Sequence, residues 1–195
     1  MATLAATMYL LNDGRACRIR SATPEDAEGV LECALEAFAT SDHTLTKADE
    51  FAMTLEKERE FLSRVQASPT ELFLIAEKQG AQTPCQPGDV LGVLNLRQPA
   101  PRRKVRHIVE LGMSIRSSHR GVGLGSALLD DAIDWAEANP VLRIMTLGVY
   151  ASNAAGLALY KRCGFVEYGR LPDGCIHDDG TLWEQLLMWR RLKAS

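Results

Sequence analysis

Arg120-Gly121-Val122-Gly123-Leu124-Gly125 is the stretch of sequence that decides the fold. The run before it, 108–115, is typical of a strand, and the run after it, 126–138, has the apolar spacing of an amphipathic helix. Glycines between a strand and a helix let a ligand approach bare backbone N–H groups, and the helix dipole adds positive potential there. Arg116, His119 and Arg120 add side-chain charge. The stretch therefore predicts a site for a phosphate-bearing ligand.

Two familiar phosphate-binding motifs do not match this stretch. A P-loop needs Gly-Lys-Ser/Thr, and the chain contains no Gly-Lys pair. A dinucleotide fingerprint needs G-x-G-x-x-G, but its last position is Ser126 when counted from Gly121 and Leu128 when counted from Gly123. The acidic residue expected about 20 positions later is replaced by Leu142-Arg143-Ile144.

The remaining pattern resembles the acyl-coenzyme A pyrophosphate loop of the GNAT superfamily of N-acetyltransferases, which reads Gln/Arg-x-x-Gly-x-Gly/Ala. Arg120, Gly123 and Gly125 match it. A second signature of that family, Asn-x-x-Ala-x-x-Leu-Tyr followed by Gly-Phe, is matched by 153–160 and 164–165, except that Gly156 stands where the family usually has alanine. The two signatures occur in the family's order, and the resemblance extends over about 70–192.

The patterns along the chain predict a mixed α/β sheet with helices on both faces. Residues 1–16 are expected to form a loose N-terminal leader, and 17–195 a single acetyltransferase domain. We expect helices at 23–40, 47–67, 124–138 and 153–162, and strands beginning at Arg18 and spanning 72–76, 90–96, 106–116, 142–149, 165–170 and 182–191. Asp130, Asp131, Asp134 and Glu137 are expected on the solvated face of the third helix.

The resemblance implies the GNAT-like fold. In that fold the sheet is mixed but mostly antiparallel, two parallel strands splay apart at its centre, and the cofactor lies in the gap. Here the splayed strands would be 106–116 and 142–150. The resemblance also implies an acetyl-CoA site, to which we assign the backbone or side chains of Met113, Ser114, Ile115, Arg120, Gly121, Val122, Gly123, Leu124, Gly125, Ser126 and Asn153.

Composition excludes several classes of function. The formal net charge of −3 argues against a general nucleic-acid surface, and no apolar run reaches the about 18 residues that a membrane helix needs. The five cysteines are odd in number and include no Cys-x-x-Cys, and the four histidines lack metal-ligand spacing. We therefore expect a cytoplasmic protein with reduced cysteines and no metal.

Acetyl transfer to an amine needs a group that removes a proton from the amine and a group that protonates the leaving thiolate. Glu110 is the candidate base, because strand alternation places it with Gly112 and Ser114 on one face. A solvated or salt-bridged glutamate is the alternative. Other candidate acids or bases are Glu36, Asp42 and His43, for each of which a surface role is the alternative.

Tyr160 is the candidate general acid, because the resemblance places this tyrosine at the thioester sulfur. The alternative is a core tyrosine that packs under the final strands. Cys163 is not assigned as a nucleophile, since direct attack needs no covalent intermediate.

We expect an N-acetyltransferase that moves an acetyl group from acetyl-CoA to a primary amine by direct attack in a ternary complex. A small-molecule amine is favoured. Amino acids, polyamines, aminoglycosides, a protein N-terminus and a lysine all remain open, as does a homodimer. Segments 38–50 and 171–182 are expected to face the substrate. The alternative from another class is a non-catalytic acyl-CoA sensor or binding module.

Overall fold

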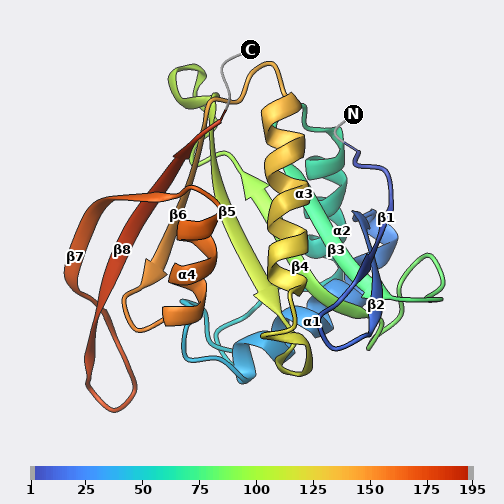
Figure 1. Cartoon of the computed structure of the whole chain (residues 1–195). Coiled ribbons are helices and arrows are strands. Elements are labelled where there is room, and N and C mark those ends of the chain that lie inside the picture. The colour runs from blue at the N-terminus through green and yellow to red at the C-terminus, as the bar shows by residue number, and fades with distance from the viewer. Residues whose placement is uncertain (1–2, 193–195) are drawn as a thin grey trace.

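Eight strands form one sheet in the computed structural model, which describes residues 3–192 (Figure 1). The strands are β1 (Thr7–Leu10), β2 (Ala16–Ser21), β3 (Leu72–Lys78), β4 (Val90–Arg97), β5 (Ile108–Ile115), β6 (Ile144–Tyr150), β7 (Val166–Ile176) and β8 (Leu182–Arg191). The helices are α1 (Ala27–Ala39), α2 (Leu55–Ala67), α3 (Leu124–Ala138) and α4 (Ala154–Arg162). The mixed sheet with helices is thus confirmed.

The strand order is β1-β2-β3-β4-β5-β6-β8-β7. The pair β5–β6 is parallel and the other neighbouring pairs are antiparallel. The parallel pairing covers only Ile108 to Glu110 against Ile144 to Thr146. Beyond these residues the two strands diverge, so 111–115 and 147–150 face each other without a ladder. The predicted central splay is therefore present between the predicted strands.

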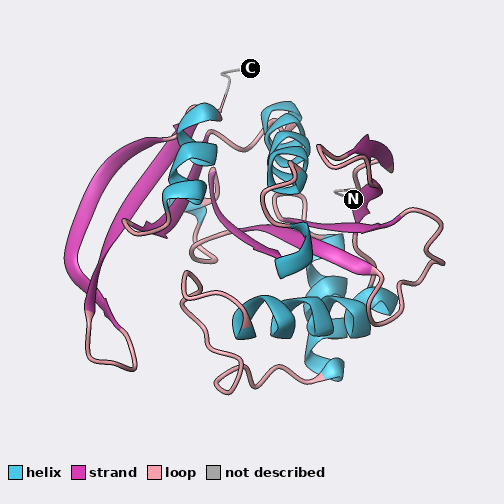
Figure 2. Ribbon diagram, turned by 60° about the horizontal axis from the view of Figure 1, so that its bottom comes forward, coloured by secondary structure: helices cyan, strands magenta, loops and turns pink. Residues whose placement is uncertain are grey.

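The helices form two layers, one on each face of the sheet (Figure 2). Helix α3 packs on β3, β4 and β5, whereas α1 packs on β4 and β5 and α2 on β3. Alternation along the strands divides the apolar side chains between the layers. Leu94, Leu96 and Leu147 belong to the larger core under α3, and Ile75 and Val93 belong to the smaller core under α1 and α2. We call these sides the α3 face and the α1–α2 face.

The helix expected over 47–67 begins eight residues later than predicted. Helix α2 starts after Thr54, whose side chain caps it by accepting a hydrogen bond from the Lys57 amide at 3.3 Å. Phe51, which suggested an earlier start, instead packs from the α1–α2 loop against Phe38, with ring centroids 5.1 Å apart. A tertiary contact of this loop had therefore been mistaken for helical periodicity.

The prediction of a loose segment over 1–16 is wrong for residues 7–10. Thr7–Leu10 forms β1 and pairs antiparallel with β2. Apolar and polar residues do not alternate clearly along this strand. Its apolar side chains Met8 and Leu10 are 52% and 77% exposed at the sheet edge, so burial does not require the usual pattern. Residues 1–2 and 193–195 lie outside the described residues. None of the helices described for this chain combines the length and the apolar character needed to cross a membrane.

The prediction that Asp131 lies on the solvated face of α3 is also wrong, because the β1 segment covers it. Asp131 is 9% exposed and accepts a short hydrogen bond from the Tyr9 hydroxyl. Burial is the main cause that raises the pKa of the Asp131 carboxyl above its usual range. The N-terminal strand is therefore attached to α3 through a polar pair.

We expect Tyr9→Phe to lower the free energy of unfolding by about 1–3 kcal/mol, because it leaves a buried carboxyl without its donor. Thermal or urea unfolding at pH 7 measures the change. The exposed Tyr168→Phe is the matched control, since Tyr168 is 56% exposed on β7. Equal stability of the two variants would show that the Tyr9–Asp131 pair contributes nothing.

Candidate active site

The glycine loop connects the end of β5 to the start of α3. Gly121 and Gly123 have φ of +74° and +92°, in the left-handed region that side-chain-bearing residues rarely adopt. Gly123 is the N-cap of α3, and the first amide bonded back to it belongs to Ala127 (3.1 Å). Within residues 3–192, the amides of 121–126 donate no hydrogen bond to another element. Bare amides at the positive end of a helix form an anion site.

Gly125 allows three elements to meet at this point. A Cβ built on it would lie 3.1 Å from Ile115 Cδ1 on β5 and 3.4 Å from Leu159 Cδ2 on α4. The absence of a side chain therefore brings α4 close to the end of β5. Tyr160 follows Leu159 on α4, so the same packing sets the position of the candidate acid relative to the glycine loop.

The basic side chains around the loop are held by other elements. Arg120 donates to the Ile115 carbonyl and, at 2.7 Å and 3.3 Å, to the Thr40 and Ala37 carbonyls at the end of α1. Arg116 pairs with Glu32 and donates to the Val90 carbonyl at 2.6 Å. The sequence suggested that these two arginines contact a phosphate directly. In the structure they instead hold the loop against α1 and β4.

The His119 ring contacts an arginine of a distant turn. Its Nε2 lies 2.7 Å from Arg15 Nη1, on the turn between β1 and β2. Burial, followed by the nearby Arg15 charge, lowers the pKa of His119. The same turn supports the loop through the Asn12 amide, which donates to the Val122 carbonyl at 3.0 Å. No pattern in the sequence connected this turn to the glycine loop.

The splay exposes two strand edges next to the loop. The edge of β5 over 111–115, which includes Met113, Ser114 and Ile115, has no strand partner on the β6 side. At the far end of β6, Asn153 caps α4 by accepting from the Gly156 amide at 2.8 Å. A Cβ on residue 156 would lie 2.8 Å from Asn153 Nδ2, which explains glycine at this position. An extended ligand with amide groups could pair with the free edge of β5 over 111–115.

Tyr160 lies in the α3-face core with its ring edge-to-face against Phe165, at 5.9 Å between centroids. Burial raises the pKa of its phenol to about 12. Its hydroxyl makes no hydrogen bond within the described chain. The side chain thus has the packing of a core tyrosine together with a protonated, unpartnered hydroxyl, and its role as the acid stays a prediction.

Glu110 lies on the opposite, α1–α2 face, and is exposed at the last residue that pairs β5 with β6. Two glycines lie near it on this face, and an amide side chain from a neighbouring strand covers each of them. Gly112 is the next residue on this face of β5, and Gly148 occupies the facing strand, where a Cβ would lie 2.9 Å from Gln185 Nε2. The carboxylate is therefore exposed where the splay begins, and its role as the base stays a prediction.

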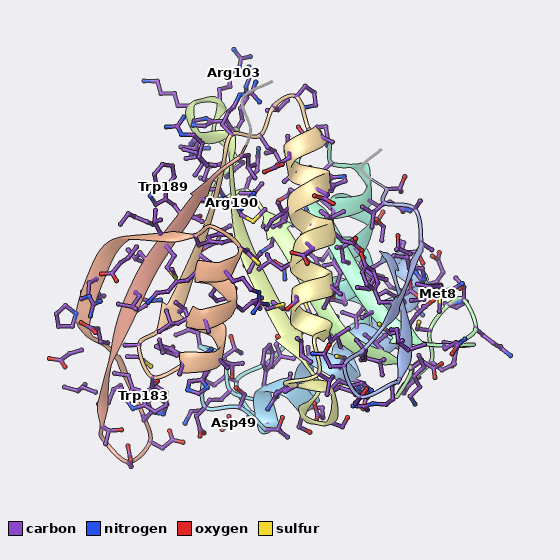
Figure 3. The ribbon with its side chains drawn as sticks, in the orientation of Figure 1. Met8, Asp49, Arg103, Trp183, Trp189 and Arg190 are labelled. Carbon is purple, nitrogen blue, oxygen red and sulfur yellow. The ribbon has the colours of Figure 1, made fainter. Side chains whose placement is uncertain are left out.

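Aromatic side chains from distant segments contact one another at the far end of this face. The Trp183 ring lies 3.5 Å from His177, 5.8 Å from Tyr150 and 5.6 Å from His43, between centroids. Lys47 of the α1–α2 loop also forms an ion pair with Asp178. Figure 3 shows Trp183 and Asp49 near the end of the molecule opposite Arg103. The two segments expected to face the substrate thus meet here.

Two polar atoms on this face are buried without a partner within residues 3–192: Asn95 Oδ1 and His177 Nε2. Each such group costs about 1–3 kcal/mol unless a ligand or water pairs with it. Neither residue was among the candidate site residues predicted from the sequence. A signal existed only for Asn95, which is the single polar residue in the run 90–96.

The other candidate acids or bases, Glu36, Asp42 and His43, have surroundings different from those of Glu110. Glu36 accepts from the Ser117 hydroxyl at 2.6 Å and so supports the turn before the glycine loop. His43 belongs to the aromatic cluster, and Asp42 is exposed beside it in sequence.

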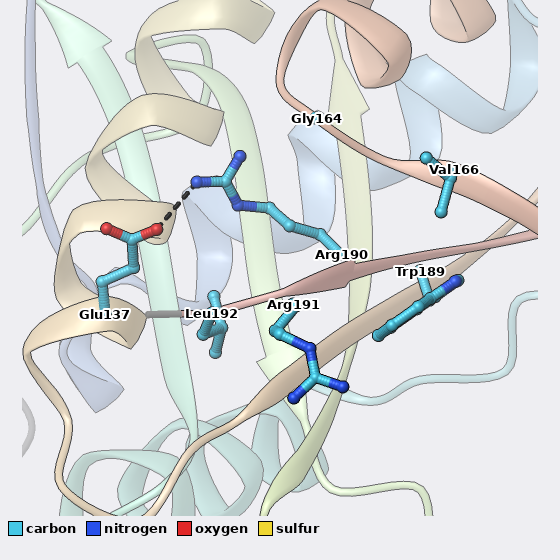
Figure 4. Close-up of a pocket in the computed structure, with 7 residues that line it drawn as sticks. All are labelled: Glu137, Gly164, Val166, Trp189, Arg190, Arg191 and Leu192. Carbon is cyan, nitrogen blue, oxygen red and sulfur yellow. Dashed lines mark hydrogen bonds and ion pairs between the residues drawn. The ribbon is translucent and has the colours of Figure 1, made fainter. Parts of the chain in front are cut away.

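A separate pocket is lined by Glu137, Gly164, Val166, Trp189, Arg190, Arg191 and Leu192 (Figure 4). Arg190 donates to Glu137 at 2.7 Å there. Glu137 lies in the last turn of α3, whereas the glycine loop precedes its first turn. A helix of this length separates its ends by about 20 Å, so the pocket is not part of the predicted site.

Part of the chain is similar to curated acetyltransferases. The L-methionine sulfoximine/L-methionine sulfone acetyltransferase of Pseudomonas aeruginosa is 35% identical over 85 residues, which are 44% of this chain and 49% of that protein. The chain thus matches about half the length of this curated relative.

Solved structures match over nearly the whole chain. An acetyltransferase of the GNAT family from Streptococcus pneumoniae superposes with a TM-score of 0.82 at 30% identity, over 90% of this chain and 99% of that one. A Salmonella typhimurium protein solved with its cofactor acetyl-CoA has a TM-score of 0.77 at 20% identity, over 96% and 95% of the two chains, and shares the fold. The model of the acetyltransferase (GNAT) family matches residues 37–165, and the chain belongs to that family.

Proposed function

We propose that this protein is an N-acetyltransferase that transfers an acetyl group from acetyl-CoA to the primary amine of a small molecule. The observation that carries the proposal is the row of bare amides over 121–126 at the start of α3, beside the splayed edges of β5 and β6. These groups complement a diphosphate and an amide-containing chain, which are the two parts of coenzyme A.

The residues present fit acetyl-CoA. The amides of 121–126 would hold the diphosphate, and Met113, Ser114 and Ile115 would pair with the pantetheine amides. Arg120 would act indirectly, since its guanidinium ties the loop to the end of α1. Asn153 would contribute its free Nδ2 group while its Oδ1 caps α4. Acetyl-CoA supplies the thioester whose acetyl group is transferred.

Glu110 and Tyr160 are suited to the two proton transfers. An alkylammonium resembles lysine, with a pKa near about 10.4, so a base must remove a proton before the nitrogen can attack. Glu110 can accept that proton on the α1–α2 face. Tyr160 stays protonated at pH 7 because burial raises its pKa to about 12, so it can donate to the leaving sulfur.

A small acceptor is supported by contacts that bridge two segments at one end of the α1–α2 face. The α1–α2 loop and the β7–β8 hairpin meet through the His43–Trp183 contact and the Lys47–Asp178 pair. A protein N-terminus or lysine would need this end to be open. The Pseudomonas relative is named for modified amino acids, which are small primary amines.

A thiol-release assay with acetyl-CoA and a panel of amines tests the proposal. We expect release to depend on one class of small primary amine, with the acetylated product visible by mass spectrometry. Acetyl-CoA binding without amine-dependent release for any member of the panel would favour the acyl-CoA sensor. Release with a peptide but with no small amine would favour a protein acceptor.

Ser126→Pro removes one amide of the loop at a first-turn position where a helix tolerates proline. Hydrogen bonds to charged groups contribute about 1.5–3 kcal/mol, so we expect the Kd for acetyl-CoA to rise about tenfold or more. Ser126→Ala is the matched control, because it also loses the hydroxyl that Arg162 contacts at 2.6 Å but keeps the amide. Calorimetric Kd values that are equal for the two variants would contradict the role of this amide.

A further inference from the structure

Asn95 is a polar side chain at an inner position of β4, in a run that is otherwise apolar from Val90 to Leu96. Its neighbours Leu94 and Leu96 are fully buried in the α3-face core, so alternation places Asn95 on the α1–α2 face. Strand β4 lies between β3 and β5 within the sheet. Asparagine is rare at such positions because its amide must be paired.

The Asn95 amide has no such pairing. Its Oδ1 atom is buried, and neither amide atom forms a hydrogen bond within residues 3–192. The amide lies over the main chain of Gly112, since a Cβ on Gly112 would meet Nδ2 at 3.1 Å and Oδ1 at 3.2 Å. The missing side chain of Gly112 therefore makes room for the amide.

Asn95 also lies beside the candidate base. Its partner across the β4–β5 ladder is Gly112, and the next pair on the same face is Arg97 with Glu110. Glu110 is the last residue of β5 that pairs with β6. The amide thus borders the point where the splay opens, with an exposed carboxylate and an exposed guanidinium two residues away along the strands.

The geometry points to Asn95 as the residue that recognises the acceptor, and to an α-amino acid as the acceptor class. The inference rests on the proposed function and adds its substrate. Oδ1 would accept a hydrogen bond from the amine, and Nδ2 would donate one to the carboxylate on the same carbon. Glu110 would attract the ammonium before taking its proton, and Arg97 would attract the carboxylate.

This arrangement distinguishes an α-amino acid from a simple amine. A decarboxylated amine can use Oδ1 but leaves Nδ2 unpaired. Sites with polar groups complementary to a substrate reject analogues that lack the partner group. We expect kcat/KM to be about 10- to 100-fold higher for an L-α-amino acid than for its decarboxylated amine.

Asn95→Asp is the decisive variant, because it keeps the shape and an acceptor oxygen but replaces the donor with negative charge. We expect kcat/KM for L-methionine, L-leucine or L-methionine sulfone, whichever the wild type acetylates, to fall by about 100-fold, mainly through KM. The decarboxylated amine should lose less than about threefold, and calorimetry should give an unchanged Kd for acetyl-CoA. Asn139→Asp, at the far end of α3, is the matched control and should leave the amino acid/amine ratio unchanged.

Stability separates recognition from a structural role. Asn95→Leu removes the unpartnered amide, so Tm without substrate should stay equal or rise while activity on the amino acid is lost. A lower Tm, or an amino acid/amine ratio that Asn95→Asp does not change, would overturn the assignment and leave the proposed function intact. If the wild type acetylates neither amino acids nor amines, the proposed function fails, and the assignment of Asn95 fails with it.

Discussion

Tyr160→Phe is expected to lower kcat by about 100-fold while the Kd for acetyl-CoA stays the same. The phenol is buried beside Phe165, and burial raises its pKa to about 12, so it remains a proton donor across the working pH range. Phenylalanine keeps the ring and its packing but cannot donate to the leaving thiolate. Steady-state kinetics with the best acceptor measures kcat, and calorimetry measures the Kd.

Tyr168→Phe controls for the loss of a phenol elsewhere, because Tyr168 is 56% exposed on β7. Its kcat should equal that of the wild type. A Tyr160→Phe variant with unchanged kcat would leave Tyr160 as a core residue, and the proton for the leaving sulfur would have to come from another group.

Glu110→Gln is expected to lower kcat/KM by about 100-fold at pH 7. Glutamine has nearly the same shape but cannot take a proton from the acceptor ammonium. The loss should shrink as the pH rises, because an alkylamine with a pKa near about 10.4 is increasingly deprotonated by the solvent. We expect the ratio of wild-type to variant rates to fall between pH 7 and pH 9.

Glu56→Gln is the control for this change, since Glu56 is an exposed glutamate on α2. A deficit of Glu110→Gln that is constant with pH would show that Glu110 positions the acceptor instead of removing its proton. No deficit at all would shift the search for the base to a water relayed by another group.

Much of the fold was predictable because local signals determined it. The glycine loop, the apolar stripe of α3 and the short helix α4 are each specified by nearby residues, and the structure places them as expected. The final strand, 182–191, also has the predicted bounds. Helix α2 was less predictable, because Phe51 packs on Phe38 from a loop, and sequence periodicity cannot distinguish that contact from a helical stripe.

The candidate site was predictable only on its cofactor side. The glycine loop is continuous in sequence, so its residues could be identified together. The acceptor side instead joins β4, β6, the α1–α2 loop and the β7–β8 hairpin. Asn95 can be recognised as a candidate site residue only from its position opposite Gly112. Trp183 can be recognised only from its contacts with His43 and His177. Such contacts depend on strand register, which the sequence patterns did not specify.

The central claim is that the main-chain amides at the start of α3 hold the diphosphate of coenzyme A. Parallel calorimetric titrations of the wild type with acetyl-CoA and with S-acetylpantetheine, which carries the thioester but no diphosphate, test it most directly. Two charge-assisted hydrogen bonds of about 1.5–3 kcal/mol each predict that acetyl-CoA binds about 100-fold or more tightly than S-acetylpantetheine. Equal affinities for the two compounds, or no heat with acetyl-CoA at millimolar concentration, would contradict the account.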